Sequence, residues 1–563
     1  MASLVKLSSA INLSIDNIIV EGLNDTFPRP FEVELLRDVA FRQRVYEAVR
    51  NSLENTDNEK FSLSELKPYP LHHVLIPKKD KYDFRRCALI HPLDVIKYST
   101  LVWRLAQLIE AERVDKDKGV VFSYRFLPGN GLIFDVNYSY TAFGRHISKK
   151  IRGDGVNALV KCDIANFYDR LNIHRLESIL LSISPNKFIV KSINELLLYW
   201  SNRDSYGLPV GSNASRLLAE ASLLEVDNYL LSHNVDFCRF VDDYRMFAPD
   251  AKTAHYWLSL LIERLSLEGL SLNMRKTDIE DVSDKKSLKF SFIGAGNGDN
   301  SSDPVGGENL SNINRMFTGY SGTIPTKFRE STENEQERVK RLNEEELFGR
   351  LKGETLLSES EFKDFCKALL YKNRFDLLVG IPELLNKFPQ FTPYVIDMLT
   401  KHEEKIPSSI RIKLSRKFSK QLINLPYLPE YIAVSIVRLL GSSGYKNKSE
   451  LMKYFRQLKR NAGHYIGRAT LESLENVISR GDVLEIRQYF IRADHWEKRQ
   501  IIKIVNRNLH DDEKRAWLKN VSIHEKDDMF AVGVYDIKGR TKQNKPKELT
   551  KKVPKVEASP AKI

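Results

Sequence analysis

The chain of 563 residues has the composition of an ordinary globular protein, with 42% hydrophobic and 29% charged residues. Lys and Arg outnumber Asp and Glu by 87 to 74, and the resulting formal charge of +13 suits a polyanionic partner such as nucleic acid or a nucleotide. Four widely separated cysteines exclude a zinc ribbon and a disulfide framework, and no apolar run predicts a membrane span or an export signal, so we expect a cytoplasmic protein.

Short runs of β-branched and aromatic residues alternate with helical patterns over residues 1–300, which we take as the first domain. This alternation predicts an α+β fold. The predicted strands are HHVLIP (72–77), RRCALIHP (85–92), NALVKCDI (157–164) and FCRFV (237–241).

The run NALVKCDIANFYDRL predicts a strand that ends at Asp163, followed by the aromatic pair Phe167 and Tyr168. An Asx turn at the end of a strand would explain Asp163 but not the aromatic pair. A carboxylate in this position can hold a metal ion while the rings wall the sugar of a nucleotide.

A Gly-Leu-Pro-Val-Gly turn at 207–211 opens a predicted helix that runs to residue 231, with Ser212 or Asn213 as its N-cap. The apolar stripe of this helix comprises Ala214, Leu217, Leu218, Ala221 and Leu224. A glycine-rich turn at a helix N-terminus can lie against bases or phosphates, but by itself such a turn is usually only a cap.

The stretch CRFVDDYRMF places Asp242 and Asp243 side by side between apolar runs. Neighbouring carboxylates raise each other's pKa, so a folded protein buries them only with compensation, often a metal ion. Asp-Asp recurs at 511–512 and 527–528 among charged residues, where it predicts solvated surface or a helix N-terminus. The dipeptide alone therefore does not define a site.

Polymerase-type nucleotidyl transfer needs two divalent ions about 4 Å apart, held by hard oxygen ligands. Asp163, Asp242 and Asp243 can supply those ligands if a tight hairpin brings the adjacent pair to one point. We expect these three residues to be both the metal ligands and the catalytic residues, with two Mg²⁺ ions that Mn²⁺ can replace.

The second half of the chain carries a different pattern. A Gly-rich break at 294–312 and a charged stretch predict a linker over 301–345, and apolar residues then recur at helical spacing over 346–525. HEAT-like helical repeats and an ordinary helical bundle both fit this spacing. The Lys-rich segment 526–563 predicts a basic disordered tail.

In order, the strand ending at Asp163, the GLPVG turn and the Phe240-x-Asp-Asp stretch resemble motifs A, B and C of reverse transcriptases. The resemblance extends over about 75–294. Its further segments are LIPKKDKYDFRRCALIHP (75–92), similar to the fingers motifs, GLSLNMRKT (269–277), similar to motif D, and FSFIG (290–294), similar to the primer grip.

This resemblance implies a right-hand polymerase with fingers and a ferredoxin-like palm. It implies that Lys78 and Arg86 grip the triphosphate, that Tyr168 clashes with a 2′-hydroxyl, and that Lys276 lies near the leaving pyrophosphate. The implied nucleotide-binding set is Lys78, Arg86, Phe167, Tyr168, Gly211, Asn213 and Lys276.

Val210 stands where many reverse transcriptases carry Gln, and Phe240 stands where they carry Tyr. No Cys/His endonuclease cluster and no Val-Thr-Gly element follows, which weakens the resemblance to mobile-intron and retron enzymes. With SYRFLPGNG (123–131) and the long helical second half, the chain most resembles the abortive-infection and unknown-group bacterial reverse transcriptases.

That resemblance implies a cytoplasmic, bacterial, metal-dependent DNA polymerase in antiphage defence, with dNTPs, a DNA product, a structured RNA and other copies of the chain as partners. It also implies template-independent, protein-primed synthesis. The alternatives are a templated retron- or intron-like reverse transcriptase, a catalytically idle nucleic-acid-binding scaffold and a palm-type nucleotide cyclase.

Overall fold

The computed structural model describes residues 3–24, 30–56, 63–78, 82–202, 204–284, 337, 339–353, 359–424, 428–458 and 464–536. The predicted primer grip at 290–294 and the Gly-rich break at 294–312 lie outside the described residues, as do most of the predicted linker and of the predicted tail.

The central sheet of the first half has four antiparallel strands in the order β6-β7-β5-β8. These strands are β5 (Ala158–Asp163), β6 (Phe237–Phe240), β7 (Asp243–Ala248) and β8 (Asp278–Asp281). The order of elements along the chain is β-α-β-β-α-β, which is the ferredoxin-like arrangement of a palm. The predicted strands at 157–164 and 237–241 are confirmed.

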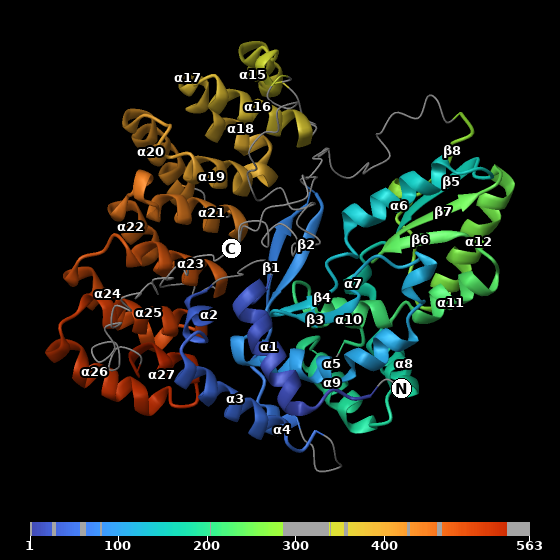
Figure 1. Ribbon diagram of the computed structural model, residues 1–563. Helices are drawn as coiled ribbons and strands as arrows, with labels where there is room; N and C mark the ends of the chain where they lie inside the picture. The colour runs from blue at the N-terminus through green and yellow to red at the C-terminus, as the bar shows by residue number, and fades with distance from the viewer. Residues whose placement is uncertain are drawn as a thin grey trace, which may run out of the picture.

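The remaining elements of the first half either pack beside this sheet or lie below it and toward the centre of the view (Figure 1). They are α1 (Leu7–Glu21), α2 (Phe31–Leu35), α3 (Val39–Leu53), α4 (Leu63–Leu66), β1 (His72–Pro77), β2 (Phe84–Leu89), α5 (Pro92–Glu112), β3 (Phe126–Gly129), β4 (Leu132–Phe134), α6 (Tyr140–Arg152), α7 (Phe167–Arg170), α8 (Ile173–Ile183), α9 (Lys187–Trp200), α10 (Asn213–Ala221), α11 (Leu224–Ser232) and α12 (Ala251–Leu267). Helices α6 and α12 pack on the sheet, and the long α5 is buried on nearly all sides between α1, α3, α9 and α10.

The fingers consist in part of the hairpin β1–β2, which pairs in register from His72 opposite Leu89 to Pro77 opposite Phe84. The predicted strand at 72–77 is confirmed with the same bounds. The Ala88 N–H donates to the carbonyl of Val210 at 3.0 Å, so β2 is joined directly to the GLPVG turn.

The helix predicted over 212–231 is two helices, α10 and α11, separated at Ser222 and Leu223. The Ser222 hydroxyl donates to the carbonyl of Ala219 at 2.7 Å. A serine that bonds back to its own helix competes with the regular backbone pattern and favours a break at that point.

The second half is entirely helical over its described residues (Figure 1). Its helices are α15 (Glu344–Gly353), α16 (Glu359–Tyr371), α17 (Phe375–Leu378), α18 (Ile381–Lys387), α19 (Thr392–Lys401), α20 (Ser408–Asn424), α21 (Glu430–Gly441), α22 (Lys448–Leu458), α23 (His464–Glu475), α24 (Arg480–Tyr489), α25 (His495–Asn508), α26 (Asp511–His524) and α27 (Met529–Asp536). From α19 to α27 each odd-numbered helix contacts the next odd-numbered one, while α20, α22, α24 and α26 flank this row.

The predicted disordered tail is wrong for residues 526–536, because α27 lies there. Phe530 of α27 is fully buried and its ring centroid lies 5.4 Å from that of Phe41 in α3. Asp528 accepts hydrogen bonds from the N–H groups of Phe530 and Ala531 and so caps α27. Of the two predictions for Asp527–Asp528, the helix N-terminus is confirmed, whereas Asp528 is buried rather than solvated.

The two halves meet through a buried ion network. Glu32 of α2 bonds both Arg468 of α23, at 2.9 Å, and Arg499 of α25, at 3.2 Å, and Arg499 also pairs with Asp528 at 3.0 Å. All four side chains are at most 3% exposed. Among the residues that the structure describes, no helix has the length and apolar character needed to cross a membrane.

Candidate active site

Three carboxylates converge at one end of the central sheet. Asp163 is the last residue of β5 and stands directly opposite Asp243, the first residue of β7. The Ile164 N–H donates to the carbonyl of Asp242 at 3.1 Å, which draws the β6–β7 turn against the end of β5. The structure therefore brings together the three residues that the sequence singled out.

The β6–β7 turn is as short as a hairpin allows. Phe240 pairs with Asp243, which leaves only Val241 and Asp242 in the turn. Val241 has a φ of +58°, a left-handed conformation that is rare and costly for a β-branched residue. This turn places both Asp242 and Asp243 beside Asp163. In a regular strand, two adjacent side chains would point to opposite faces of the sheet, so only one of them could lie there.

The site is short of positive charge. Burial and the carboxylates of Asp163 and Asp243 raise the pKa of Asp242 to about 8. Burial also raises the pKa of Asp243, although the Arg245 guanidinium, 3.7 Å away, acts in the opposite direction. A cation placed among these carboxylates would relieve their repulsion.

Lys276 supplies one such cation. Its Nζ lies 2.9 Å from Oδ2 of Asp163, and it belongs to a short 3-10 helix, Met274–Lys276, after α12. Partial burial lowers the pKa of Lys276, but the charges of Asp163, Asp243 and Asp242 outweigh this effect and raise it. The residue predicted to lie near the pyrophosphate thus contacts one of the three predicted catalytic carboxylates in this structure.

The donor set fits a divalent ion in its chemistry, because three carboxylates offer the hard oxygen ligands that Mg²⁺ prefers. Within the described part of the chain, however, no three His, Cys, Asp or Glu side chains are already grouped so as to enclose a metal ion. The Lys276 ammonium shows that a cation is favoured beside Asp163. Asp163 would release Lys276 when it becomes a metal ligand.

The aromatic pair lies between the end of β5 and the GLPVG turn. Asn166 has a left-handed φ of +47° and begins the single-turn α7, in which Phe167 is 2% and Tyr168 is 9% exposed. The Tyr168 carbonyl accepts a hydrogen bond from the Leu208 N–H at 2.9 Å. Burial and the neighbouring Tyr124 hold the pKa of the Tyr168 phenol well above its usual value.

Gly211 has a φ of +111° and lets the chain turn into α10, where Ser212 is the N-cap. Asn213, predicted to bind nucleotide, has its amide turned toward α1. It donates to Oε2 of Glu21 at 2.7 Å and to Oδ1 of Asn17 at 3.1 Å. Of these residues, Gly211 lies at the turn itself, whereas the Asn213 side chain is engaged away from it.

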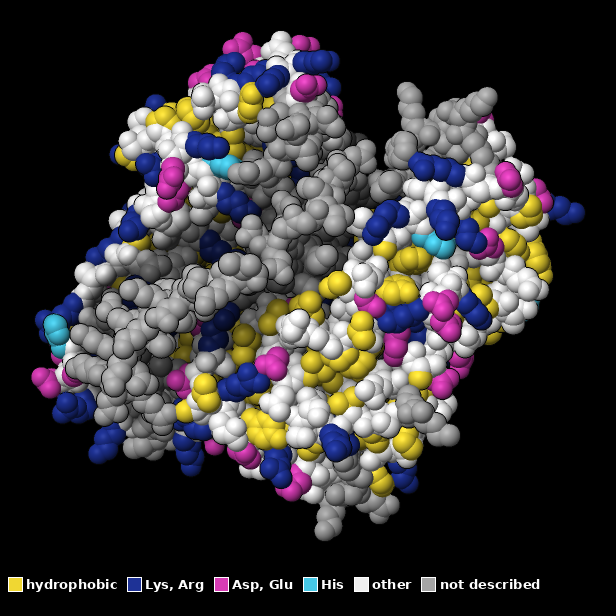
Figure 2. All heavy atoms as spheres, in the orientation of Figure 1, with side chains coloured by type: hydrophobic (Ala, Val, Ile, Leu, Met, Phe, Trp, Pro, Cys, Tyr) yellow, Lys and Arg dark blue, Asp and Glu magenta, His cyan; other side chains and the backbone are white. Residues whose placement is uncertain are grey.

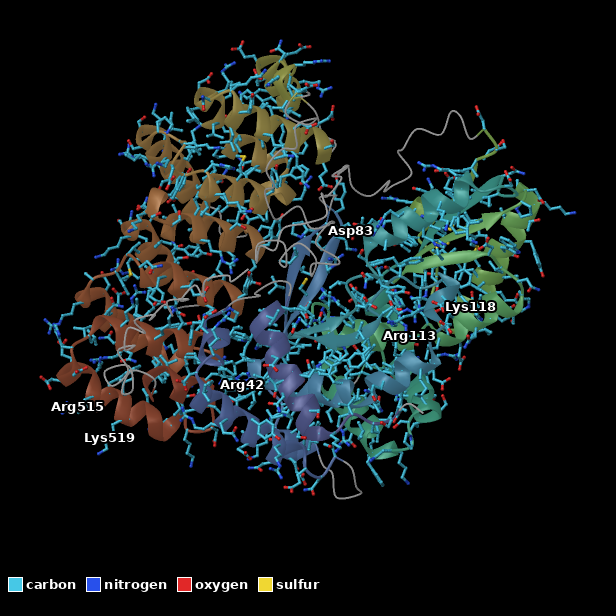
Figure 3. The ribbon with its side chains drawn as sticks, viewed as in Figure 1. Arg42, Asp83, Arg113, Lys118, Arg515 and Lys519 are labelled. Atoms are coloured by element: carbon cyan, nitrogen blue, oxygen red, sulfur yellow. The ribbon has the colours of Figure 1, made fainter. Side chains whose placement is uncertain are left out.

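Two predicted phosphate-binding cations belong to the fingers hairpin. Lys78 pairs with Asp83 at 3.0 Å, at the end of the hairpin shown in Figure 3, and Arg86 lies 3.2 Å from Nδ1 of His73. Partial burial raises the pKa of Asp169 in α7. The positive charges of Arg86, Lys78 and Arg85 act in the opposite direction but do not outweigh burial. The fingers cations therefore lie within electrostatic reach of the segment that follows Asp163.

Tyr140, the first residue of α6, lies beside the β6–β7 hairpin and was not among the residues predicted from the sequence. Its ring meets Phe240 edge-on, with centroids 5.3 Å apart, and its side chain is partly exposed. Burial raises its pKa to about 12, and the charges of Asp243, Asp163 and Asp242 contribute in the same direction. No signal in the sequence separates Tyr140 from the other tyrosines, because its neighbours in space come from β6 and β7.

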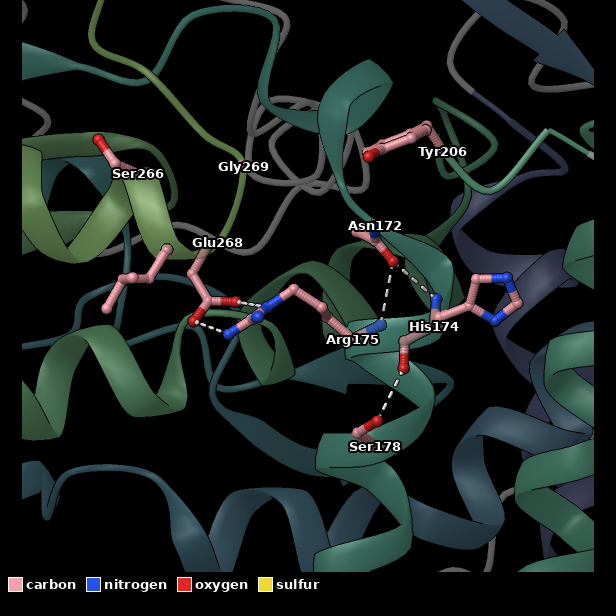
Figure 4. A pocket seen from close by; sticks show the side chains of 9 residues that line it. Asn172, His174, Arg175, Ser178, Tyr206, Ser266, Glu268 and Gly269 are labelled. Carbon is pink, nitrogen blue, oxygen red and sulfur yellow. Dashed lines mark hydrogen bonds and ion pairs between the residues drawn. The ribbon is translucent and has the colours of Figure 1, made fainter.

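Two surface features lie on the palm outside the carboxylate site. Figure 2 shows Lys and Arg side chains gathered over α6, where Arg145, Lys149 and Arg152 are exposed. A pocket of about 420 Å³ lies beside the start of α8 (Figure 4). It is lined by Asn172, His174, Arg175, Ser178, Tyr206, Ser266, Leu267, Glu268 and Gly269, and contains none of the three carboxylates.

A protein-family model described as reverse transcriptase (RNA-dependent DNA polymerase) matches residues 76–296. This span includes the carboxylates, the GLPVG turn and the fingers cations. The protein therefore contains a reverse transcriptase domain and is a nucleotidyltransferase of the RNA-directed DNA polymerase type. No curated protein matches the sequence.

Solved structures similar to this chain include three telomerase structures. Telomerase from Candida albicans in complex with the TWJ fragment of telomeric RNA shares 13% identity over 70% of this chain and 67% of that one, with a TM-score of 0.27. Apo telomerase from Candida tropicalis shares 12% identity over 65% and 67%, with a TM-score of 0.29. The Candida tropicalis enzyme with the same RNA fragment shares 13% over 65% and 64%, with a TM-score of 0.27.

Proposed function

We propose that the protein is a metal-dependent DNA polymerase of the reverse transcriptase type that acts in bacterial antiphage defence. The observation that carries the polymerase activity is the register of Asp163 opposite Asp243, with Asp242 held beside them in a two-residue turn. The defence role is supported by the sequence resemblance to abortive-infection and unknown-group enzymes. Its place of action would be the bacterial cytoplasm.

The proposed roles follow from position and charge. Two Mg²⁺ or Mn²⁺ ions bound by Asp163, Asp242 and Asp243 would supply charge neutralisation for the attacking hydroxyl and for the triphosphate. Lys78 and Arg86 would bind the phosphates from the fingers side. Lys276, once released from Asp163, would be a cation free to meet the pyrophosphate.

Selection of the sugar is assigned to the aromatic pair after β5. Phe167 and Tyr168 are fixed by burial and by the bond from Leu208 to the Tyr168 carbonyl, so neither ring can easily move aside. A ring fixed beside the carboxylates would exclude a 2′-hydroxyl and favour dNTPs. We expect Tyr168→Ala to increase ribonucleotide incorporation relative to deoxynucleotide incorporation, measured with each nucleotide separately.

Synthesis without a template, primed on a hydroxyl of the protein itself, is part of this proposal, and we propose Tyr140 as the priming residue. Its phenol oxygen would attack the α-phosphate of the first dNTP, form a phosphotyrosyl bond, lose its proton and release pyrophosphate. Tyr140 is partly exposed and lies within electrostatic reach of all three carboxylates.

The helical second half is proposed to be a HEAT-like array that binds a structured RNA or another copy of the chain. The row of contacts among α19, α21, α23, α25 and α27, flanked by the even-numbered helices, supports a stacked array over an irregular bundle. The exposed basic side chains on α6 add affinity for a polyanion.

A single experiment tests the polymerase and priming proposals together. Purified protein is incubated with each dNTP separately and with all four, in Mg²⁺ or Mn²⁺, and the product is digested with protease or with nuclease. We expect long DNA that remains linked to a peptide containing Tyr140. Tyr140→Phe should abolish the protein-linked product while leaving extension of a supplied primer intact.

One observation favours a second candidate, an idle nucleic-acid-binding scaffold. The Lys276–Asp163 ion pair occupies one of the three proposed metal ligands. No incorporation with any dNTP in either metal would support the scaffold. Cyclic dinucleotides in place of long DNA would indicate a palm-type nucleotide cyclase, and strict dependence on an added RNA template would indicate a retron- or intron-like enzyme.

A further inference from the structure

Val241, which precedes Asp242 in the β6–β7 turn, is in a conformation that it would not adopt alone. Its φ is +58° and it is only 1% exposed. A β-branched residue in the left-handed region persists only where surrounding contacts hold it. The position of Asp242 depends on those contacts, because Asp242 is the next residue in the chain.

Both backbone polar groups of Val241 are held by side chains. The Val241 N–H donates to Oγ of Ser123 at 2.9 Å, and the Val241 carbonyl accepts from Nη1 of Arg239 at 3.2 Å. Each bond fixes the plane of one of the two peptide groups that flank Val241. Together they fix the direction in which the chain enters Asp242.

Glu220 of α10 joins these two side chains to each other. It accepts from the Ser123 hydroxyl at 2.5 Å and from Nη1 of Arg239 at 2.8 Å. A hydroxyl has one proton to donate. Because Ser123 gives that proton to Glu220, its oxygen is set to accept from Val241, which fixes the direction of both hydrogen bonds.

Arg239 and Glu220 are themselves anchored. Asp227 of α11 receives two hydrogen bonds from Arg239, at 2.7 and 2.6 Å, and Arg113 donates to Glu220 at 2.7 Å. The five residues are at most 5% exposed. Two guanidinium groups balance two carboxylates, so the buried charges are paired within the network and its geometry is tightly constrained.

We propose that Ser123, Glu220 and Arg239 are positioning residues for the catalytic turn. They hold Val241 in its left-handed conformation and thereby keep Asp242 beside Asp163 and Asp243. When the hydrogen bonds of the Val241 backbone with Ser123 and Arg239 are lost, Val241 relaxes toward negative φ and Asp242 leaves the metal-binding position. This inference rests on the proposed function, because it assigns the network to the same carboxylate site.

A network that only stabilises the core would explain the same contacts, and metal binding separates the two explanations. Ser123→Ala removes the acceptor for the Val241 N–H and leaves every charge in place. Its binding of Mn²⁺, measured by electron paramagnetic resonance, is expected to be about tenfold weaker than that of the wild type. Ser123→Thr, which keeps the hydroxyl, should restore most of the affinity.

Ser192→Ala is the matched control. Ser192 is also fully buried, but its hydroxyl donates to the Phe188 carbonyl within α9, away from the turn. This variant is expected to bind Mn²⁺ as the wild type does. All titrations are made at a temperature at which each variant remains folded by circular dichroism.

The effect of Ser123→Ala is then measured again in protein that also carries Val241→Gly, because glycine adopts positive φ without strain and does not need to be held there. If Ser123 acts by holding the turn, Ser123→Ala should weaken Mn²⁺ binding about tenfold with Val241 present and by no more than about twofold in the Val241→Gly background. Equal weakening in both backgrounds, or unchanged Mn²⁺ binding in Ser123→Ala, would overturn the proposal.

Failure of this inference is distinguishable from failure of the proposed function. Mn²⁺ binding that depends on Ser123 in a protein that incorporates no nucleotide supports the positioning role and contradicts the polymerase. Incorporation that Ser123→Ala leaves unchanged, together with unchanged Mn²⁺ binding, supports the polymerase and contradicts the positioning role.

Discussion

Two groups of buried carboxylates in this molecule have opposite electrostatic surroundings. At the joint between the halves, Glu32 and Asp528 face arginines, and the charges of Arg468 and Arg499 outweigh burial and hold the pKa of Glu32 below its ordinary value. At the β6–β7 turn, Asp242 and Asp243 face other carboxylates, and burial raises the pKa of both. A buried carboxylate paired with arginine contributes to stability. A buried carboxylate next to other carboxylates is repelled by them, and a bound cation can relieve this repulsion.

The largest effect should come from removing the repelling carboxylates. Asp242→Ala combined with Asp243→Ala is expected to reduce nucleotide incorporation by at least about a thousandfold, since two of the three proposed metal ligands are lost. The fold should persist, because the repulsion between the carboxylates is removed and Arg245, which loses Asp243, keeps its hydrogen bond to the carbonyl of Tyr244. Incorporation is measured with labelled dNTPs and folding by circular dichroism, and persistent incorporation would remove the site assignment.

At the joint, the same kind of change should act on stability instead. Glu32→Gln leaves Arg468 and Arg499 short of a buried negative charge, and we expect a loss of about 3–5 kcal/mol in the free energy of unfolding. Glu34→Gln on the same helix is the control, because Glu34 is 58% exposed and pairs with Arg37 on the surface. Its effect should stay below about 1 kcal/mol. Urea unfolding measures both, and equal losses would contradict the distinction.

The same carboxylate-to-amide change at the β6–β7 turn should have the opposite effect on stability. Asp242→Asn removes repulsion and should stabilise the metal-free protein, by about 1–3 kcal/mol. A carboxyl with a raised pKa holds a proton that the unfolded chain has lost, so wild-type stability falls as pH rises toward about 8, and the advantage of the variant grows over that range. Thermal unfolding in EDTA measures the stability difference between Asp242→Asn and the wild type. Saturating Mg²⁺ should reverse the sign of this difference, because Mg²⁺ binding stabilises the wild type.

The smallest effect concerns acid. The pKa of Glu32 is lowered from its ordinary 4.5, so its stabilisation is present above that pH and is lost as pH falls toward the folded-state pKa. The stability difference between wild type and Glu32→Gln should therefore shrink below about pH 4.5. Unfolding curves at pH 7, 5 and 4 would show this trend, and a constant difference would mean that the Glu32 charge is not responsible.

Local patterns in the sequence were sufficient for the strands at 72–77 and 157–164 and for the grouping of Asp163 with Asp242 and Asp243. A strand, a turn and their end residues are determined largely by neighbours in the chain. The Ser222 break between α10 and α11 was missed because it depends on one side-chain hydrogen bond within an otherwise helical pattern.

The contacts that join residues far apart in the chain, including those of the proposed positioning residues, could not be predicted from the sequence. Ser123, Glu220 and Arg239 are far apart in the chain, and each alone is an ordinary polar residue. The Glu32–Arg468 pair joins residues 436 positions apart. The Lys276 contact with Asp163 depends on the register of the segment that follows α12, which periodicity does not specify.

Helix α27 has a practical consequence for where this protein can be cut. Phe530 packs on Phe41, and Asp528 pairs with Arg499, so a segment near the C-terminus fastens α3 and α25 together. A chain shortened at residue 525, the end suggested by composition, would lack the Phe530 ring that packs on Phe41 of α3 and the Asp528 carboxylate that pairs with Arg499. The shortest version expected to keep the joint closed ends after Asp536.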